Sequence, residues 1–251
     1  MNSRNLSFFV AVALAGGAAS AQAVPLGDHA SVELFAGGNA GMPGAFSAGK
    51  TTIAPAAGGD IVFDHVDFSS AYSNRYIGGA EFDYAVDSHL SGFARAAYSQ
   101  FDGRSREVGS TLANDGRMPI DAHFADNSMR QLDLGARYTF APGARLRPFV
   151  GLGLGASDLA ATRASIDIPV GGASRVELAK GGTVFEQRLE TGLQYSPVRN
   201  FDLRLTAAAS HLGGQRASDD PNLELLGVAP THSTVSSRWD YPAELGAVYH
   251  F

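Results

Sequence analysis

The 251-residue sequence contains no cysteine, so disulfide bonds and thiolate metal sites are excluded. An exported chain that needs neither is compatible with this composition. Basic residues are also in deficit, because 19 Lys and Arg residues against 25 Asp and Glu residues give a formal net charge of −6. This balance argues against nucleic acid as a partner. Glycine, in contrast, is abundant at 30 residues, well above the roughly 7% of average usage.

Long apolar runs are missing after the first segment of the chain. No later stretch approaches the roughly 18 consecutive apolar residues of a transmembrane helix. The first segment has Arg4, an apolar core over 6–15, and small residues that end in two A-x-A sites. This order predicts a secretory signal peptide over residues 1–23, with cleavage after Ala21 or Ala23. Its short core and two glycines argue against a membrane-spanning helix.

The last fourteen residues, 238–251, alternate between two kinds of side chain. Trp239, Tyr241, Leu245, Tyr249 and Phe251 share one face. The other face is small, polar or charged. A period of two predicts a β-strand with a different environment on each face, and its length suits a tilted membrane crossing, which needs about 9–11 residues. The segment is therefore predicted to be the closing strand of a β-barrel.

Seven earlier segments repeat this alternation. They cover 32–36, 75–86, 90–101, 131–140, 150–156, 185–195 and 201–209. With the closing strand they predict an all-β fold, a transmembrane antiparallel up-and-down β-barrel of eight strands within residues 24–251. In the third long connection, 165–168 and 175–178 alternate and could pair as a hairpin above the membrane. Residues 51–68 could likewise extend or add strands, so ten strands are the alternative. Phe93 and Phe101 interrupt the pattern, since both fall on the polar face of their strand.

The connections between these segments alternate in length. Short ones lie at 87–88, 141–147 and 196–200, whereas long ones cover 38–74, 102–128, 157–183 and 212–237. Short periplasmic turns opposite long extracellular loops are typical of outer-membrane barrels, and both termini then lie in the periplasm. A soluble domain rarely contains four structureless loops of this length. The long connections are therefore predicted to be extracellular loops.

Aromatic residues are predicted to gather at both ends of the apolar face. The turn-end group is Tyr84, Tyr138, Phe140, Tyr195, Tyr249 and Phe251, and the loop-end group includes Trp239 and Tyr241. Two aromatic belts around a Leu, Val and Ala band match the two interfaces of a membrane. A soluble lipocalin-type barrel, the alternative, has no need of such belts.

The opposite face carries the charges. The predicted lumen network comprises Glu81, Asp83, Arg95, Asp133, Arg137, Glu186, Arg188, Glu190, Asp202, Arg204 and Glu244, with Glu33, Arg75 and Asp240 on the same face. An eight-stranded barrel is just wide enough for side chains to fill it. Mutual ion pairs would close the lumen, and a narrow pore is the alternative. We expect Arg137 and Arg204 to be sealing bases, with Asp133, Asp202 and Glu190 as partners.

Other motifs predict no catalytic, cofactor or metal site. Gly151 to Gly155 lacks the spacing of a nucleotide-binding loop, and no helix pattern follows it. Ser210 and His211 are adjacent on a strand and point to opposite sides, so they cannot form a nucleophile–base pair. Two loop clusters, 64–67 and 121–126, contain possible cation ligands, but their spacing fits no known metal loop.

The signal peptide, the eight-strand pattern, the segments 134–140 and 147–155, and the terminal 249–251 resemble the small OmpA/OmpX-type outer-membrane barrels. The resemblance covers essentially the whole mature chain, which lacks the periplasmic domain of two-domain members. It implies a monomeric, non-catalytic protein of the bacterial outer membrane that acts through surface loops or stabilises the envelope. Implied partners are membrane lipid, lipopolysaccharide, and the barrel-assembly machinery through the C-terminal strand. A narrow channel and a lipid A-modifying enzyme are the alternatives.

Overall fold

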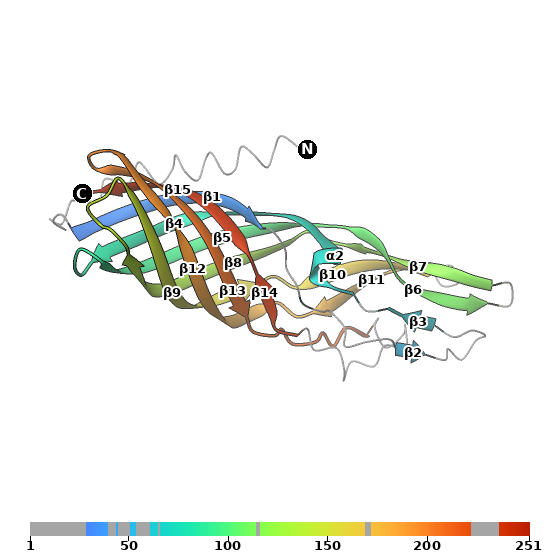
Figure 1. Ribbon diagram of the computed structural model, residues 1–251. Coiled ribbons are helices and arrows are strands. Elements are labelled where there is room, and N and C mark those ends of the chain that lie inside the picture. Colours follow the sequence, from blue (N-terminus) through green and yellow to red (C-terminus); the bar gives the residue numbers. More distant parts are fainter. Residues whose placement is uncertain are drawn as a thin grey trace, which may run out of the picture.

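A computed structural model describes residues 29–39, 44, 51–53, 61–64, 66–113, 116–168, 172–221 and 236–251. The predicted signal peptide lies outside these ranges. Eight antiparallel strands form a closed barrel (Figure 1). They are β1 (Ala30–Asn39), β4 (Tyr72–Ala85), β5 (Leu90–Gly103), β8 (Asn127–Thr139), β9 (Leu146–Leu159), β12 (Gly182–Val198), β13 (Phe201–Leu212) and β15 (Pro242–His250), with the short β14 (Arg238–Asp240) preceding β15. The predicted eight-stranded barrel is confirmed.

The barrel closes by pairing its first and last strands. β1 pairs with β15 from Ser31 opposite His250 to Asn39 opposite Pro242, and β12 pairs with β13 to complete the ring. The Phe251 N–H donates to the Ala30 carbonyl oxygen at 3.2 Å, so both ends of the described barrel lie at the turn end. The predicted closing strand is thus correct, although Tyr241 interrupts it between β14 and β15.

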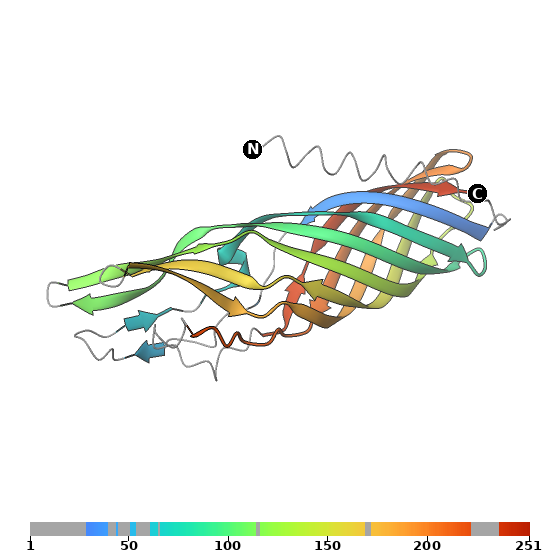
Figure 2. The same ribbon diagram turned by 180° about the vertical axis from the view of Figure 1, so that it is seen from behind.

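A second sheet extends from the opposite end of the barrel (Figures 1 and 2). Its order is β11-β10-β7-β6-β3-β2. These strands are β2 (Thr51–Ile53), β3 (Ile61–Phe63), β6 (Ser105–Ala113), β7 (Gly116–Phe124), β10 (Thr162–Ile168) and β11 (Gly172–Ala179). We call this sheet the extended sheet. Because its strands lie outside the barrel ring, the ten-stranded alternative is wrong.

The extended sheet confirms the predicted hairpin of 165–168 and 175–178, and it adds the hairpin β6–β7, which the sequence did not predict. Segments 102–128 and 157–183 contain the hairpins β6–β7 and β10–β11. Their alternation is that of a soluble sheet, because Ile120, Ala122 and Phe124 are buried while Asp121 and His123 are exposed. The inward side chains are apolar here, whereas those of the barrel wall are polar, so the alternation expected of a membrane strand does not identify β6 and β7.

An apolar core lies beneath the extended sheet. We call it the upper core. It contains Phe68 and Ala71 from the short helix α2 (Phe68–Ala71) and residues from both sheets. Its buried members are Val66, Phe68, Ala71, Tyr72, Phe101, Val108, Ile120, Ala122, Phe124, Met129, Leu159, Ala164, Ile166, Val176, Ala179 and Leu212. The core joins the extended sheet to the barrel strands, because Phe101, Met129 and Leu212 belong to the barrel wall.

The barrel exterior is apolar, as its alternation predicts. Leu134 is 68% exposed, whereas its neighbour Asp133 is 2% exposed. Exposed aromatic side chains stand at both ends of this band, with Tyr84, Tyr138, Phe140, Tyr195, Tyr249 and Phe251 at the turn end and Trp239 and Tyr241 at the other. A band of exposed large apolar side chains that runs around every wall of the barrel is unusual for a soluble monomer and typical of a lipid-facing or partner-facing surface. Among the described residues, no helix is long and apolar enough to cross a membrane.

Candidate functional site: the charged lumen

Glycines on β9 make room for the charges inside the barrel. Gly151, Gly153 and Gly155 face inward, opposite the leucines that face outward. A Cβ atom at Gly151 would lie 2.8 Å from the Glu190 Oε1 atom, and one at Gly155 would lie 2.2 Å from the Asp133 Oδ1 atom. The glycines therefore serve to accommodate charged side chains from the two neighbouring strands.

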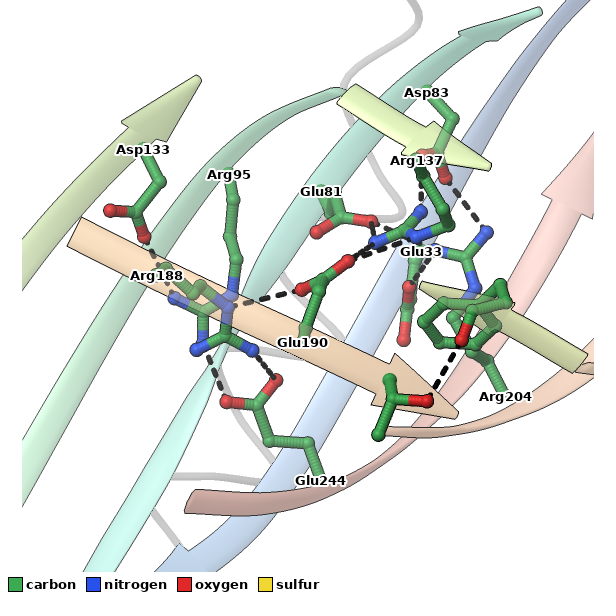
Figure 3. Close-up of polar contacts among 12 residues, drawn as sticks. Glu33, Glu81, Asp83, Arg95, Asp133, Arg137, Arg188, Glu190, Arg204 and Glu244 are labelled. Carbon is green, nitrogen blue, oxygen red and sulfur yellow. Dashed lines mark hydrogen bonds and ion pairs between the residues drawn. The ribbon is translucent and has the colours of Figure 1, made fainter. Parts of the chain in front are cut away.

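Arg137 on β8 is the centre of the largest ion-pair cluster (Figure 3). Its Nη1 atom donates to Asp83 Oδ1 at 2.6 Å, and its Nη2 atom donates to Glu81 Oε1 at 2.8 Å and Glu190 Oε1 at 2.6 Å. The rings of Phe93 and Phe149 lie 5.0 Å and 4.9 Å from its guanidinium carbon. Phe93 thus belongs on the inward face of its strand, because its ring packs against a cation.

Arg204 on β13 reaches the same carboxylates from the other side of the barrel. It donates to Glu33 Oε2 at 2.5 Å, Glu81 Oε1 at 2.8 Å and Asp83 Oδ2 at 3.0 Å. Glu190, expected as a partner of the two sealing bases, contacts Arg137. Asp133 and Asp202, also expected as partners, contact neither arginine. Asp133 pairs instead with Arg95, and Asp202 pairs with Arg147 and His250.

Arg95 and Arg188 form the next level of the lumen (Figure 3). Arg95 donates to Asp133 Oδ2 at 3.1 Å and to Glu244 Oε1 at 2.7 Å. Arg188 donates to the second Glu244 oxygen and to Glu190 Oε2, both at 3.1 Å. Glu190 therefore links this level to Arg137, and the guanidinium–carboxylate contacts continue along the barrel axis.

The loop end of the lumen is lined by amides and hydroxyl groups as well as charges. Arg75 pairs with Asp240 and donates to Gln131 Oε1 at 3.0 Å. Gln131 in turn donates to both oxygens of Glu186 at 2.9 Å, and the Ser157 hydroxyl donates to the same carboxylate. Above this level, the inward positions become apolar and the upper core begins.

A cavity of about 130 Å³ opens at the turn end of the lumen. We call it the vestibule. Its lining includes Asp83, Arg137, Arg147, Gln194, Arg204 and His250. Asp202 pairs there with Arg147 and with His250 Nε2, the latter at 2.6 Å. The sequence predicts Arg147 to lie in a turn, but β9 begins at Leu146, four residues before the predicted strand, so Arg147 lies on the strand and reaches the lumen.

All eleven residues of the predicted lumen network are buried inside the barrel. Among the described residues, nine carboxylates and six arginines are buried. The acids are Glu33, Glu81, Asp83, Asp133, Glu186, Glu190, Asp202, Asp240 and Glu244. The arginines are Arg75, Arg95, Arg137, Arg188, Arg204 and Arg238. The partly buried Arg147 adds a seventh base. The described lumen therefore contains more acids than arginines.

Outside the lumen, the structure places the adjacent Ser210 and His211 on opposite sides of the barrel wall. Ser210 is buried, whereas the His211 ring lies 5.1 Å from that of Trp239 on the exterior. His65, from the possible cation cluster at 64–67, lies outside the described residues. The Ser105 hydroxyl lies 2.7 Å from His123 Nδ1 on the exposed face of the extended sheet, a pair that sequence separation conceals. In the described part of the chain, no carboxylate is recorded against this histidine.

No protein-family model and no curated protein matches the sequence. Several solved structures of outer-membrane barrels are similar to the chain. Neisserial surface protein A has a TM-score of 0.44 at 12% identity, covering 90% of this chain and 98% of its own. The outer membrane protein OprG of Pseudomonas aeruginosa has a TM-score of 0.41 at 12% identity, covering 90% of this chain and 99% of its own. The outer membrane protease OmpT of Escherichia coli has a TM-score of 0.42 at 10% identity, covering 89% of this chain and 97% of its own.

Proposed function

We propose that this chain is a monomeric outer-membrane barrel without catalytic activity, which is closed by its lumen charges and acts through the extended sheet outside the cell. The apolar exterior with an aromatic belt at each end supports insertion in a lipid bilayer. The turn end then faces the periplasm and the extended sheet faces the medium. Lipid and lipopolysaccharide surround the barrel, and the C-terminal strand is the element for the barrel-assembly machinery to engage.

The extended sheet carries this proposal. Flexible loops would have to be ordered before they could present a surface, whereas paired strands over an apolar core are already ordered. The outward positions on three adjacent strands are polar, and Ser105, His123 and Ser165 are aligned across them. The next aligned row is Glu107, Asp121 and Asp167. This face therefore offers hydrogen-bonding and charged groups to a partner at a fixed spacing.

Changing the outward face alone tests this function. The triple variant Glu107→Ser, Asp121→Ser and Asp167→Ser leaves the inward core residues in place. Bacteria that produce the wild-type protein should adhere to host cells or to one another more than bacteria that lack it, and the triple variant should lose most of that gain. The matched control is Leu134→Ala on the lipid-facing side, which should retain it. Full adhesion by the triple variant would contradict the proposal.

A further inference from the structure

Three buried carboxylates share two arginines in the lower lumen. We call Glu33, Glu81 and Asp83 the acidic triad. One oxygen atom from each lies within 4.8 Å of the other two. Among the described residues, they form ion pairs with Arg137 and Arg204 alone, since Glu33 contacts only Arg204 and the other two contact both arginines. If every carboxyl group were ionised, the triad with its two arginines would retain one negative charge.

The surrounding groups do not remove this excess. Glu190 from β12 adds a fourth carboxylate to Arg137, and Arg188 compensates it while also contacting Glu244. Arg95 from β5 is occupied by Asp133 and Glu244. At the vestibule, Arg147 from β9 and His250 from β15 both contact Asp202 on β13. Each of these bases therefore has its own carboxylate, and none is recorded against the triad.

An unmatched carboxylate in such a site is costly. Removing an ion from water costs several kcal/mol in real proteins, and this cost must be offset by an opposite charge. A buried acid that lacks one instead takes up a proton and becomes neutral. When several carboxylates lie this close, the proton belongs to the group as a whole. The geometry thus calls for one positive charge beyond the two guanidinium groups.

We propose that the acidic triad is a proton-binding site, which holds one proton at neutral pH and thereby keeps the lumen closed. Glu33 is the principal carrier, because it has a single ion pair whereas Glu81 and Asp83 have two each. A metal ion fits less well, since arginine N–H groups occupy four of the six carboxylate oxygens, and the remaining two are too few for six-fold or higher coordination. The site has an entry path, because Asp83 lines the vestibule.

The proton makes the stability of the barrel depend on pH. In the unfolded chain the three carboxyl groups titrate near 4, so at pH 7 the folded protein holds one proton more than the unfolded chain. The contribution of this proton to stability is then fully present at acidic pH. It decreases as pH rises toward the pH at which the folded triad releases its proton. Loss of that proton leaves the unmatched negative charge beside the vestibule and loosens the closure.

Reversible urea unfolding in detergent micelles between pH 5 and pH 8 tests the site. The folding equilibrium constant of the wild type should fall by up to tenfold per pH unit from this one proton. Glu33→Gln, which mimics the protonated group, should reduce that slope by about one proton and stabilise the barrel at pH 8. Glu190→Gln is the control, because it removes a carboxylate that is fully paired, so it should weaken the barrel at every pH and retain the slope.

The same slope in Glu33→Gln as in wild type would overturn the proposal. So would a wild-type stability that falls on addition of EDTA at constant pH, because the closing charge would then be a metal ion. Infrared spectroscopy of the wild type keeps the proposal testable if the variant fails to fold. A protonated carboxyl C=O band should be present in the folded barrel at pH 7 and lost at alkaline pH, and its absence at pH 7 would refute the site.

Discussion

The lumen and the upper core both fill the space between the same strands, yet they fill it with opposite chemistry. In the lumen, Ser99, Gln131 and Ser157 point inward beside ion pairs. Two residues further along the same three strands, the inward side chains are Phe101, Met129 and Leu159 in the upper core. The interior between the same strands therefore changes from polar to apolar over two residues.

This inversion follows from what lies outside each region. Where lipid covers the barrel, the apolar residues of the alternation face outward and the polar residues must satisfy one another inside. Where water covers the strands, the apolar residues gain by facing inward, as in a soluble sheet. The position of the inversion therefore marks the outer edge of the proposed membrane span, at the level of Phe101, Met129 and Leu159.

The largest loss of stability is expected from a substitution of Arg137 in the lumen. Arg137→Ala leaves Glu81, Asp83 and Glu190 without their shared base, and removing one partner of a buried ion pair costs about 3–5 kcal/mol. We expect the free energy of unfolding in urea to fall by that amount. Arg137→Lys should recover only part of it, because an ammonium group cannot reproduce the three-way guanidinium contacts. An unchanged unfolding midpoint in Arg137→Ala would show that the ion pairs contribute little.

Ile120→Ala tests the other region. The side chain is fully buried in the upper core, and such truncations cost about 2–5 kcal/mol. The loss should appear as faster proteolysis of the extended sheet while the barrel keeps its heat-modifiable mobility in gels. High salt should leave this loss unchanged, since no charge is involved. Unfolding of the barrel together with the sheet would show that the two regions form one cooperative unit.

Gly155→Val tests whether the glycines of β9 make room for the charged side chains of the lumen. A Cβ atom at this position would lie 2.2 Å from Asp133 Oδ1 and 2.3 Å from the Leu132 carbonyl oxygen. Overpacking of this kind costs about 1–3 kcal/mol. Gly143→Ala in a turn is the control, because nothing lies within 4 Å of its Cβ position. Equal unfolding midpoints for the two variants would refute the role given to the β9 glycines.

The smallest effect is expected in the turn between β4 and β5. Backbone N–H groups of His89 and Leu90 donate to Asp87 Oδ1 at 2.7 Å and 2.8 Å, and they hold the pKa of this exposed carboxyl below its ordinary value of 3.8. A lowered pKa contributes stability above the ordinary value, and the contribution is lost as pH falls through the folded pKa. Asp87→Ala should therefore lower the unfolding midpoint slightly at pH 7 and not at pH 2. An equal loss at both pH values would contradict this.

The alternation of side chains was sufficient to predict the strand number, the outward apolar residues and the set of inward charges, because each depends only on position along a strand. The ion-pair partners depend on strand tilt and stagger, which bring Arg204 to Glu33 across 171 residues, and sequence separation does not carry that information. Within the extended sheet, the hairpin of 165–168 and 175–178 was predicted, whereas β6–β7 was not, because its inward apolar residues, such as Ile120 and Phe124, alternate as in a soluble sheet and not as in a membrane strand.

Ion conductance of the wild-type protein in planar lipid bilayers at neutral pH tests the central claim most directly. A lumen closed by the contacts of Arg137 and Arg204, beneath an apolar upper core, should show little or no steady current. Arg137→Ala, measured in the same bilayers, should conduct more than wild type. A large and stable open channel in the wild type would contradict the closed lumen and favour the pore function instead.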